Sequence, residues 1–175
     1  MNTPALSLQS NDFELLGLPQ QFAQNATALD AAWKRLQAQV HPDKFSAEPA
    51  ASQRLAMQWS VRLNEAYQRL KKPISRAAYL CELAGAPIQA HHNTAMPTDF
   101  LMQQMQWREA LADAGQDADA LQTLFEAAQA WQKKALALCA QQLDNAHDAL
   151  AAAGTVRQLL FVDKFLHEVE NQLDF

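Results

Sequence analysis

The stretch His41-Pro42-Asp43-Lys44-Phe45 decides how the first half of the chain folds. On both sides of it, apolar residues recur every three or four positions, as they do along one face of an amphipathic helix. Pro42 lacks the N–H that a helix interior needs and disfavours the helical conformation at His41, so the first helix ends here. The sequence therefore predicts an antiparallel helical hairpin with a polar loop at its tip. The apolar positions are Leu29, Trp33, Leu36 and Val40 before the loop, and Leu55, Trp59, Leu63, Ala66 and Leu70 after it.

Composition extends the helical prediction to the whole chain. The 175 residues are 49% hydrophobic, and they include only 4 glycines and 7 prolines. This indicates an all-α protein of one domain or two small ones. No run of 18 apolar residues predicts a membrane span, and no secretory signal is visible. Cys81 and Cys139 are isolated, which favours buried, reduced thiols in a cytoplasmic protein over a disulfide or a metal site.

The net charge of −5 is unevenly distributed. Residues 1–80 carry nine Lys and Arg against six Asp and Glu, a net +3, whereas residues 81–175 carry five against thirteen, a net −8. Because phosphate binding needs clustered cations, the acidic half argues against nucleic acid as the main partner. The opposite signs suggest two partners of different charge character.

Caps and breakers divide the chain into seven expected helices. Asn11 is the expected N-cap of the first helix, which Gly17 ends, and Asn25 or Thr27 is that of the second. Gly154 lies inside the last helix, at a cost of about 1 kcal/mol relative to Ala that a kink or close packing would explain. A linker is expected at residues 85–96, where the exposed pair His91-His92 lacks the further ligands of a metal site. The expected helices cover residues 12–16, 27–40, 50–70, 73–84, 97–114, 118–143 and 146–173.

The helix expected at 97–114 has two apolar sides. On a helical wheel Phe100, Trp107 and Leu111 fall within roughly 40° and predict the core face. Leu101 and Met105 lie about 100–140° from Phe100, and Met102 about 200°. In the last helix Phe161 and Phe165 point about 120° and 80° from the centre of the apolar stripe. Such side chains indicate a wide core, packing against the last helix of the first domain, or a binding surface, and methionines suit a binding surface.

The hairpin resembles a J-domain, the module that stimulates ATP hydrolysis by heat-shock chaperones of the DnaK class. Besides His41-Pro42-Asp43, the resemblance rests on Trp33-Lys34-Arg35-Leu36, Leu63-Asn64-Glu65-Ala66-Tyr67 and Arg76-Ala77-Ala78-Tyr79. It implies a J-domain over residues 1–84. The polar residues 1–10, before the first expected helix, are expected to be a frayed tail. The chaperone contact that it implies comprises His41, Pro42, Asp43, Lys34, Arg35 and Lys44, with Gln39 in place of a usual lysine.

The second half is similar to the HscB type of J-protein. The resemblance rests on residues 99–111, on Thr155-Val156-Arg157, on residues 161–164 and on Leu173-Asp174-Phe175. It implies that the three-helix bundle at 97–175 holds the iron–sulfur scaffold protein IscU, which is delivered to the specialised ATPase HscA. Two departures from the family's pattern are Gln106, where an acid is common, and Trp107, where a charge is usual. The implied scaffold contacts are Leu101, Met102, Met105, Gln106, Glu109, Asp113 and Phe161.

We therefore expect a co-chaperone and not an enzyme, with no metal, cofactor, nucleic acid or membrane as its partner. His41 and Asp43 could imitate a hydrolase pair, but no nucleophile or metal cluster is fixed beside them. Two alternatives stay open. One is a J-protein that serves a different client, and the other is a helical bundle that acts as an enzyme or binds a small ligand. The latter would need a deep pocket with perturbed titratable groups.

Overall fold

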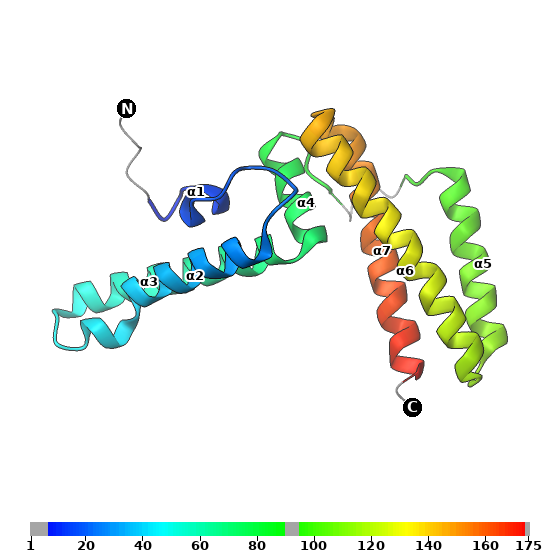
Figure 1. The fold of residues 1–175 in the computed structure, drawn as a ribbon, viewed down its shortest axis with the longest axis horizontal. Coiled ribbons are helices and arrows are strands. Elements are labelled where there is room, and N and C mark those ends of the chain that lie inside the picture. Colours follow the sequence, from blue (N-terminus) through cyan, green and yellow to red (C-terminus); the bar gives the residue numbers. More distant parts are fainter. Residues whose placement is uncertain (1–6, 90–94, 174–175) are drawn as a thin grey trace. The chain divides into compact units, whose positions relative to one another are not determined.

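The computed structural model describes residues 7–89 and 95–173, and every regular element in these ranges is helical. This confirms the predicted all-α class. The chain divides into two compact units, Met1–Arg76 and Ala77–Phe175, and Figure 1 shows its course through the helices. Within the described ranges, no helix is long and apolar enough to cross a membrane.

The predicted hairpin forms the body of the first unit (Figure 1). Helix α2 spans Ala26–Val40, helix α3 spans Ala50–Lys71, and a short 3-10 helix over Pro42–Phe45 lies in the loop between them. The two helices pair through Gln37 and Ser60. The Gln37 amide donates to the Ser60 carbonyl at 2.9 Å, and Ser60 Oγ donates back to Gln37 Oε1 at 3.0 Å.

Burial along the hairpin is uneven. The predicted apolar position Leu55, near the tip, is 50% exposed, whereas Leu63 and Leu70 are buried. The difference arises because helix α1 (Asp12–Leu16) covers only the part of α3 that lies away from the tip. The stripe predicted for α3 is therefore a core face at its C-terminal end only.

Helix α1 begins and ends as its sequence predicts. Asn11 Oδ1 accepts from the Glu14 N–H at 2.9 Å, and the Glu14 carboxylate accepts from the Asn11 N–H at 3.0 Å. This reciprocal capping box satisfies two N–H groups that a helix start leaves unpaired. Gly17 ends the helix at φ 64°, in the left-handed conformation that glycine adopts without steric cost.

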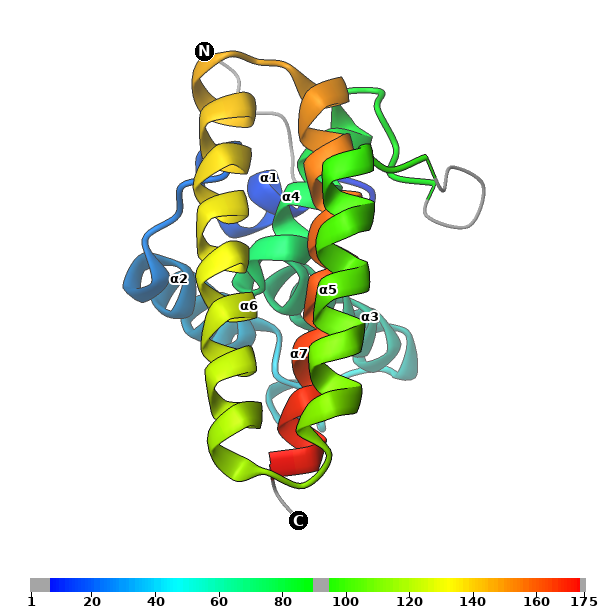
Figure 2. The ribbon, with the colours of Figure 1, turned by 90° about the vertical axis from the view of Figure 1, so that its right-hand side faces the viewer.

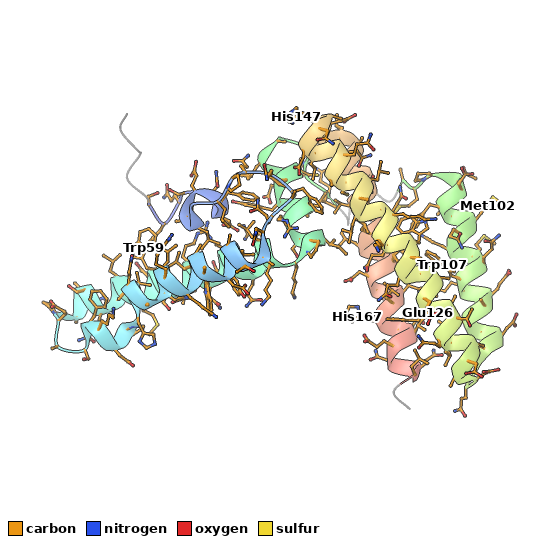
Figure 3. The ribbon with its side chains drawn as sticks, in the orientation of Figure 1. Trp59, Met102, Trp107, Glu126, His147 and His167 are labelled. Carbon is orange, nitrogen blue, oxygen red and sulfur yellow. The ribbon has the colours of Figure 1, made fainter. Side chains whose placement is uncertain are left out.

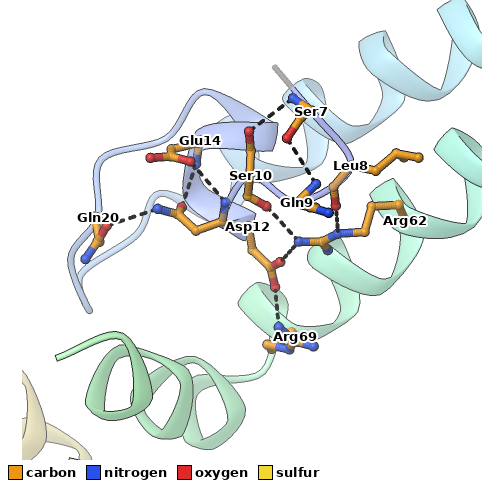
Figure 4. A network of polar contacts seen from close by, with 10 residues as sticks. Ser7, Leu8, Gln9, Ser10, Asp12, Glu14, Gln20, Arg62 and Arg69 are labelled. Carbon is orange, nitrogen blue, oxygen red and sulfur yellow. Dashed lines mark hydrogen bonds and ion pairs between the residues drawn. The ribbon is translucent and has the colours of Figure 1, made fainter. Parts of the chain in front are cut away.

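A buried carboxylate fastens α1 to α3 (Figure 4). The side chain of Asp12 is fully buried, and Arg62 Nη2 donates to its Oδ1 at 2.7 Å. Arg69 Nη1 lies 3.1 Å from the other oxygen, Oδ2. Arg62 also donates to the carbonyl groups of Leu8 and Ser10, so it holds the segment before α1 as well. Because a buried charge is tolerated only when paired, the two arginines are what allow Asp12 to lie there.

Helix α4 (Pro73–Leu83) contains the division between the two units. In the first unit, the Arg76 guanidinium donates to the Leu70 carbonyl at 2.6 Å and lies 4.9 Å from the ring centroid of Phe22. From Ala77 onward, α4 belongs to the second unit. Contacts in a folded chain do not measure which fragments fold alone. The predicted domain ranges, 1–84 and 97–175 with a linker at 85–96, therefore stay a prediction.

Three long helices lie side by side in the second unit: α5 (Thr98–Ala114), α6 (Ala118–Ala140) and α7 (Ala149–Leu173) (Figure 2). Successive helices run antiparallel, which confirms the predicted bundle. Aromatic rings fill its centre, where Trp107 stacks on Phe165 with centroids 5.5 Å apart. The buried core cluster comprises Phe100, Trp107, Leu111, Leu121, Leu124, Ala128, Val162, Phe165, Leu166 and Val169.

The structure corrects the second unit's predicted details in three places. Phe165, expected away from the core stripe, is fully buried, because α7 packs against both α5 and α6 and so buries a wider arc. The helix expected to break at Asp144 continues as a π-helix over Gln141–Asn145, and the last helix begins at Ala149 and not near Ala146. Thr155 of α7 donates a 2.9 Å hydrogen bond to Gln142 of the π-helix. Gly154 makes no close packing contact, since an added Cβ would meet only Arg157 Nη2, at 3.7 Å.

Candidate functional site

The hairpin tip of the first unit presents His41 and Asp43 to solvent. Their side chains are 55% and 89% exposed. His41 ends α2, and its Nδ1 accepts from the Asp43 N–H at 3.3 Å, while Lys44 N–H donates to the His41 carbonyl at 3.0 Å. Pro42 begins the 3-10 helix, where its missing N–H costs nothing. The loop therefore has a defined backbone, with an imidazole and a carboxylate side by side on its surface.

The other residues expected to contact a chaperone are also accessible. Lys34 and Arg35 are exposed on α2, and Lys44 is exposed in the loop. None of the ion pairs found among the described residues involves these three cations. Gln39 is exposed on the same helix and adds no charge. Lys34, Arg35 and Lys44 are therefore three accessible cations on α2 and in the loop that follows it.

Helix α5 exposes an apolar surface that we call the α5 patch: Leu101, Met102 and Met105. These side chains are 44%, 56% and 64% exposed. On the opposite side of the helix, Trp107 and Leu111 are only 6% and 7% exposed. Figure 3 shows Met102 pointing away from the bundle and Trp107 pointing into it. The helical wheel therefore identified both sides of α5 correctly, and the outward apolar side is covered by nothing in the described chain.

Polar residues border the α5 patch. Gln106, Glu109 and Asp113 are exposed on the same helix, and neither carboxylate takes part in an ion pair found among the described residues. An apolar centre with unpaired acids at its edge is the composition of a protein-binding surface. Because Trp107 is buried, its departure from the family's pattern changes the core beneath the patch and not the surface itself.

Phe161 is only half-buried and adjoins the core from helix α7. Its ring meets Phe100 edge to face, with centroids 6.0 Å apart. The guanidinium carbon of Arg108 lies 5.8 Å from its centroid. Phe161 is therefore partly exposed and also packs against Phe100, whereas the sequence predicted a ring that points away from the core.

Sequence reasoning missed Arg108. Its guanidinium pairs with Glu168 of α7, with Nη1 2.6 Å from Oε2, and it contacts two phenylalanine rings. The two charged residues are 60 positions apart, so no local spacing indicates that they meet. Their pairing becomes visible only when α5 and α7 are side by side.

The two thiols are poor candidates for chemistry. Cys81 and Cys139 are free and buried. Burial raises the pKa of Cys81 to about 11 and that of Cys139 to about 12, so both stay protonated near neutral pH. Within the described ranges, no group of three or more His, Cys, Asp or Glu side chains could hold a metal ion. The pair His91-His92 lies outside the described residues.

A helical hairpin with His-Pro-Asp at its tip, followed by a helical bundle, defines a two-part J-protein. A family model described as the HSCB C-terminal oligomerisation domain matches residues 96–170. The co-chaperone protein HscB homolog of Azoarcus sp. (strain BH72) is 44% identical over 172 residues, 97% of each chain. The Burkholderia cenocepacia homolog is 45% identical over 171 residues, again 97% of each. The chain belongs to the HscB co-chaperone family.

Solved structures agree with this assignment. The chaperone HscB from Vibrio cholerae superposes with a TM-score of 0.81 at 35% identity, over 94% of this chain and 98% of that one. Human co-chaperone HscB superposes with a TM-score of 0.89 over 95% of this chain and 84% of that one. Its 24% identity supports the fold alone. Both comparisons extend over the hairpin as well as the bundle.

Proposed function

We propose that the chain stimulates the ATPase of an HscA-class heat-shock chaperone and delivers the iron–sulfur scaffold protein IscU to it. His41, Pro42 and Asp43 would engage the ATPase, together with Lys34, Arg35 and Lys44. Scaffold contacts would come from Leu101, Met102, Met105, Gln106, Glu109, Asp113 and Phe161. The chain would then act by bringing two proteins together and would catalyse no reaction itself.

The observation that carries the proposal is the exposure of the α5 patch. Three large apolar side chains are 44–64% exposed on a helix whose other face is well buried. Leaving such surface in water is unfavourable by roughly 25 cal/mol per Å², so an apolar patch of this kind favours a protein partner. Methionine side chains are flexible, and they can adapt to a surface whose shape changes. Glu109 and Asp113 would orient that partner.

Two further observations favour this function over an enzyme. A hollow of about 760 Å³ in the second unit has no titratable side chain among Gly115, Gln116, Ala118, Leu121, Gln172 and Leu173, which line it. Another, of about 500 Å³, is shallow and open, and its carboxylates, Asp113 and Asp117, are exposed. Burial raises the pKa values of Cys81 and Cys139 to about 11 and 12, so these thiols are protonated and out of reach of a substrate. Reduced thiols also suit a chain that works in the cytoplasm.

A single-turnover ATPase assay tests the proposal. We expect the full chain to accelerate ATP hydrolysis by an HscA-class chaperone, and IscU to increase the effect further. Calorimetric titration of the full chain with IscU should give one site. Stimulation without IscU binding would favour a J-protein that serves another client. No stimulation of the ATPase would overturn the assignment of the hairpin tip.

Self-association must be measured in the same experiment, because the matched family model is described as an oligomerisation domain. Sedimentation of the chain alone, over a range of concentrations, gives its oligomeric state. A dimer that dissociates when IscU is added would mean that copies of the chain compete with the scaffold for the α5 patch. A stable dimer that still binds IscU would place self-association elsewhere.

A further inference from the structure

Arg108 stands at the border between helices α5 and α7. Its Nη1 lies 2.6 Å from Glu168 Oε2, and both side chains are partly exposed. Its guanidinium carbon is 5.8 Å from the ring centroid of Phe161 and 5.4 Å from that of Phe165. At these distances a cation is attracted to the face of an aromatic ring. One α5 side chain therefore contacts three residues of α7.

The two phenylalanines under Arg108 differ in what else holds them. Phe165 is fully buried and stacks on Trp107, with ring planes 13° apart, so the core fixes its position. Phe161 is only half-buried, and among aromatic rings it meets Phe100 edge to face at 6.0 Å. Removing Arg108 would thus leave Phe165 in place but free one side of Phe161.

The proposed scaffold surface depends on this placement, because it is made of two helices. Leu101 and Met105 come from α5, whereas Phe161 comes from α7. They can form one continuous apolar surface only if the Phe161 ring keeps a fixed position beside α5. Arg108 lies seven residues from Leu101 and three from Met105, so it shares their side of the helix.

We propose that Arg108 is the positioning residue of the scaffold surface. By pairing with Glu168 and lying over Phe161, it holds the Phe161 ring next to Leu101 and Met105 before the partner arrives. Arginine suits this role because its planar guanidinium can pair with a carboxylate while its face lies on a ring. The inference rests on the proposed function, since it concerns affinity for the same partner. Beyond the proposed function, the inference states that the affinity for IscU depends on Arg108, which acts by positioning Phe161.

Binding measurements separate positioning from direct contact. Arg108→Ala should weaken IscU binding about tenfold, as expected for loss of about 1.4 kcal/mol of preorganisation. Glu168→Ala should weaken it in the same direction. Because the two residues act as a unit, the double variant should be no weaker than Arg108→Ala alone. Additive losses, or no loss for Glu168→Ala, would mean that Arg108 contacts the partner directly, and the inference would be wrong.

Two control variants each remove one charge, of the sign carried by Arg108 or by Glu168, from another position on α7. Lys164→Ala deletes one exposed cation and Glu170→Gln one exposed carboxylate, so each should change affinity less than twofold. Arg108→Lys keeps the charge but loses the planar group, and it should restore only part of the affinity. Equal losses for Arg108→Ala and Lys164→Ala would overturn the inference, because net charge would then explain both.

A second readout needs no partner. Nuclear Overhauser effects between the Phe161 and Phe100 rings should be strong in the full chain and weak in Arg108→Ala, whereas those between Phe165 and Trp107 should persist. Unchanged Phe161 contacts would overturn the positioning role. If the unsubstituted chain does not bind IscU, the proposed function fails, but the ring contacts still decide whether Arg108 positions Phe161.

Discussion

Arg62 Nη2 lies 2.7 Å from Oδ1 of Asp12, a carboxylate with no exposed surface. We expect Asp12→Asn to destabilise the first unit by about 3–5 kcal/mol, because it leaves Arg62 and Arg69 facing a neutral group that cannot balance them. Urea denaturation followed by circular dichroism would measure the loss. Glu65→Gln, which removes an exposed carboxylate from α3, the helix that carries Arg62 and Arg69, should stay within about 0.5 kcal/mol. Similar values for the two variants would show that the buried pair contributes little.

The hairpin tip is expected to matter for activity and not for folding. His41→Gln should abolish stimulation of an HscA-class ATPase and leave the melting temperature nearly unchanged, because the His41 side chain is 55% exposed. Single-turnover ATPase assays and thermal melts would check this. Gln58→Ala, on the exposed surface of α3 and outside the proposed contact, is the control and should keep full stimulation. A large loss of helix in His41→Gln, or undiminished stimulation, would contradict the assignment.

Truncation of the α5 patch should separate binding from stability. As hot spots of the proposed scaffold surface, Leu101→Ala and Met105→Ala should each weaken IscU binding by about 1–4 kcal/mol. Their melts should barely change, because both side chains are well exposed. The core controls Leu111→Ala and Leu166→Ala should lose about 2–5 kcal/mol of stability. Early melting of the patch variants would mean that these side chains serve the fold instead.

Substitutions of Phe161 are expected to act differently from substitutions of Glu109 and Asp113, the acids that border the α5 patch. Because Phe161 packs on Phe100, Phe161→Ala should lose both affinity and some stability, which differs from a purely exposed ring. Glu109→Gln and Asp113→Asn remove exposed charges, so their effect on affinity should shrink as salt is added. Titrations at two ionic strengths would distinguish these contributions. A salt-independent loss would show that the acids make buried contacts with the partner.

Gly154→Ala should stabilise the second unit by about 0.5–1 kcal/mol. Alanine is favoured over glycine inside a helix, and the added Cβ would meet Arg157 Nη2 at an ordinary 3.7 Å. Chemical denaturation of the full chain would show the gain. Gly115→Ala should instead destabilise by about 1–3 kcal/mol, because Gly115 has φ 54° and ψ −109°, which alanine adopts only under strain. A destabilised Gly154→Ala would point to packing that the contacts do not reveal.

The buried thiols predict how stability depends on pH. Their pKa values rise from the ordinary 9.0 to about 11 and 12 through burial, so above pH 9 the unfolded state loses protons that the folded state keeps. Stability should therefore fall as pH rises from about 9 toward 11–12. A Cys81→Ala, Cys139→Ala variant should show a shallower decline in the same urea titrations. An identical decline would assign the pH dependence to other groups.

Sequence alone predicted the parts of the fold that depend on local spacing. The hairpin, the N-cap at Asn11 and the two sides of α5 follow from periodicity and caps, and the structure confirms them. It did not predict contacts between distant positions. Asp12 meets Arg62 across 50 residues, and Arg108 meets Glu168 across 60. Only the packing of helices against each other brings such groups together.

In the candidate site, too, local spacing predicted some side-chain positions and missed those that depend on contacts between helices. The wheel of α7 treated one apolar stripe as the core, but α7 packs against two helices, so Phe165 is buried and Phe161 is half-buried. The outward direction of Leu101, Met102 and Met105 was predictable because α5 contributes only one face to the core. Which partner covers that surface is a proposal that spacing cannot decide.

The sulfur atoms of the second unit differ in their exposure to oxidants. Cys81 and Cys139 are buried and stay protonated, which protects them from oxidation. Met102 and Met105 present their thioethers to solvent, and no methionine belongs to the buried core of the described chain. Oxidation to the sulfoxide makes a methionine side chain polar. Hydrogen peroxide would therefore damage the surface proposed to bind the scaffold while the helices beneath it remain folded, and enzymatic reduction of the sulfoxides would restore it.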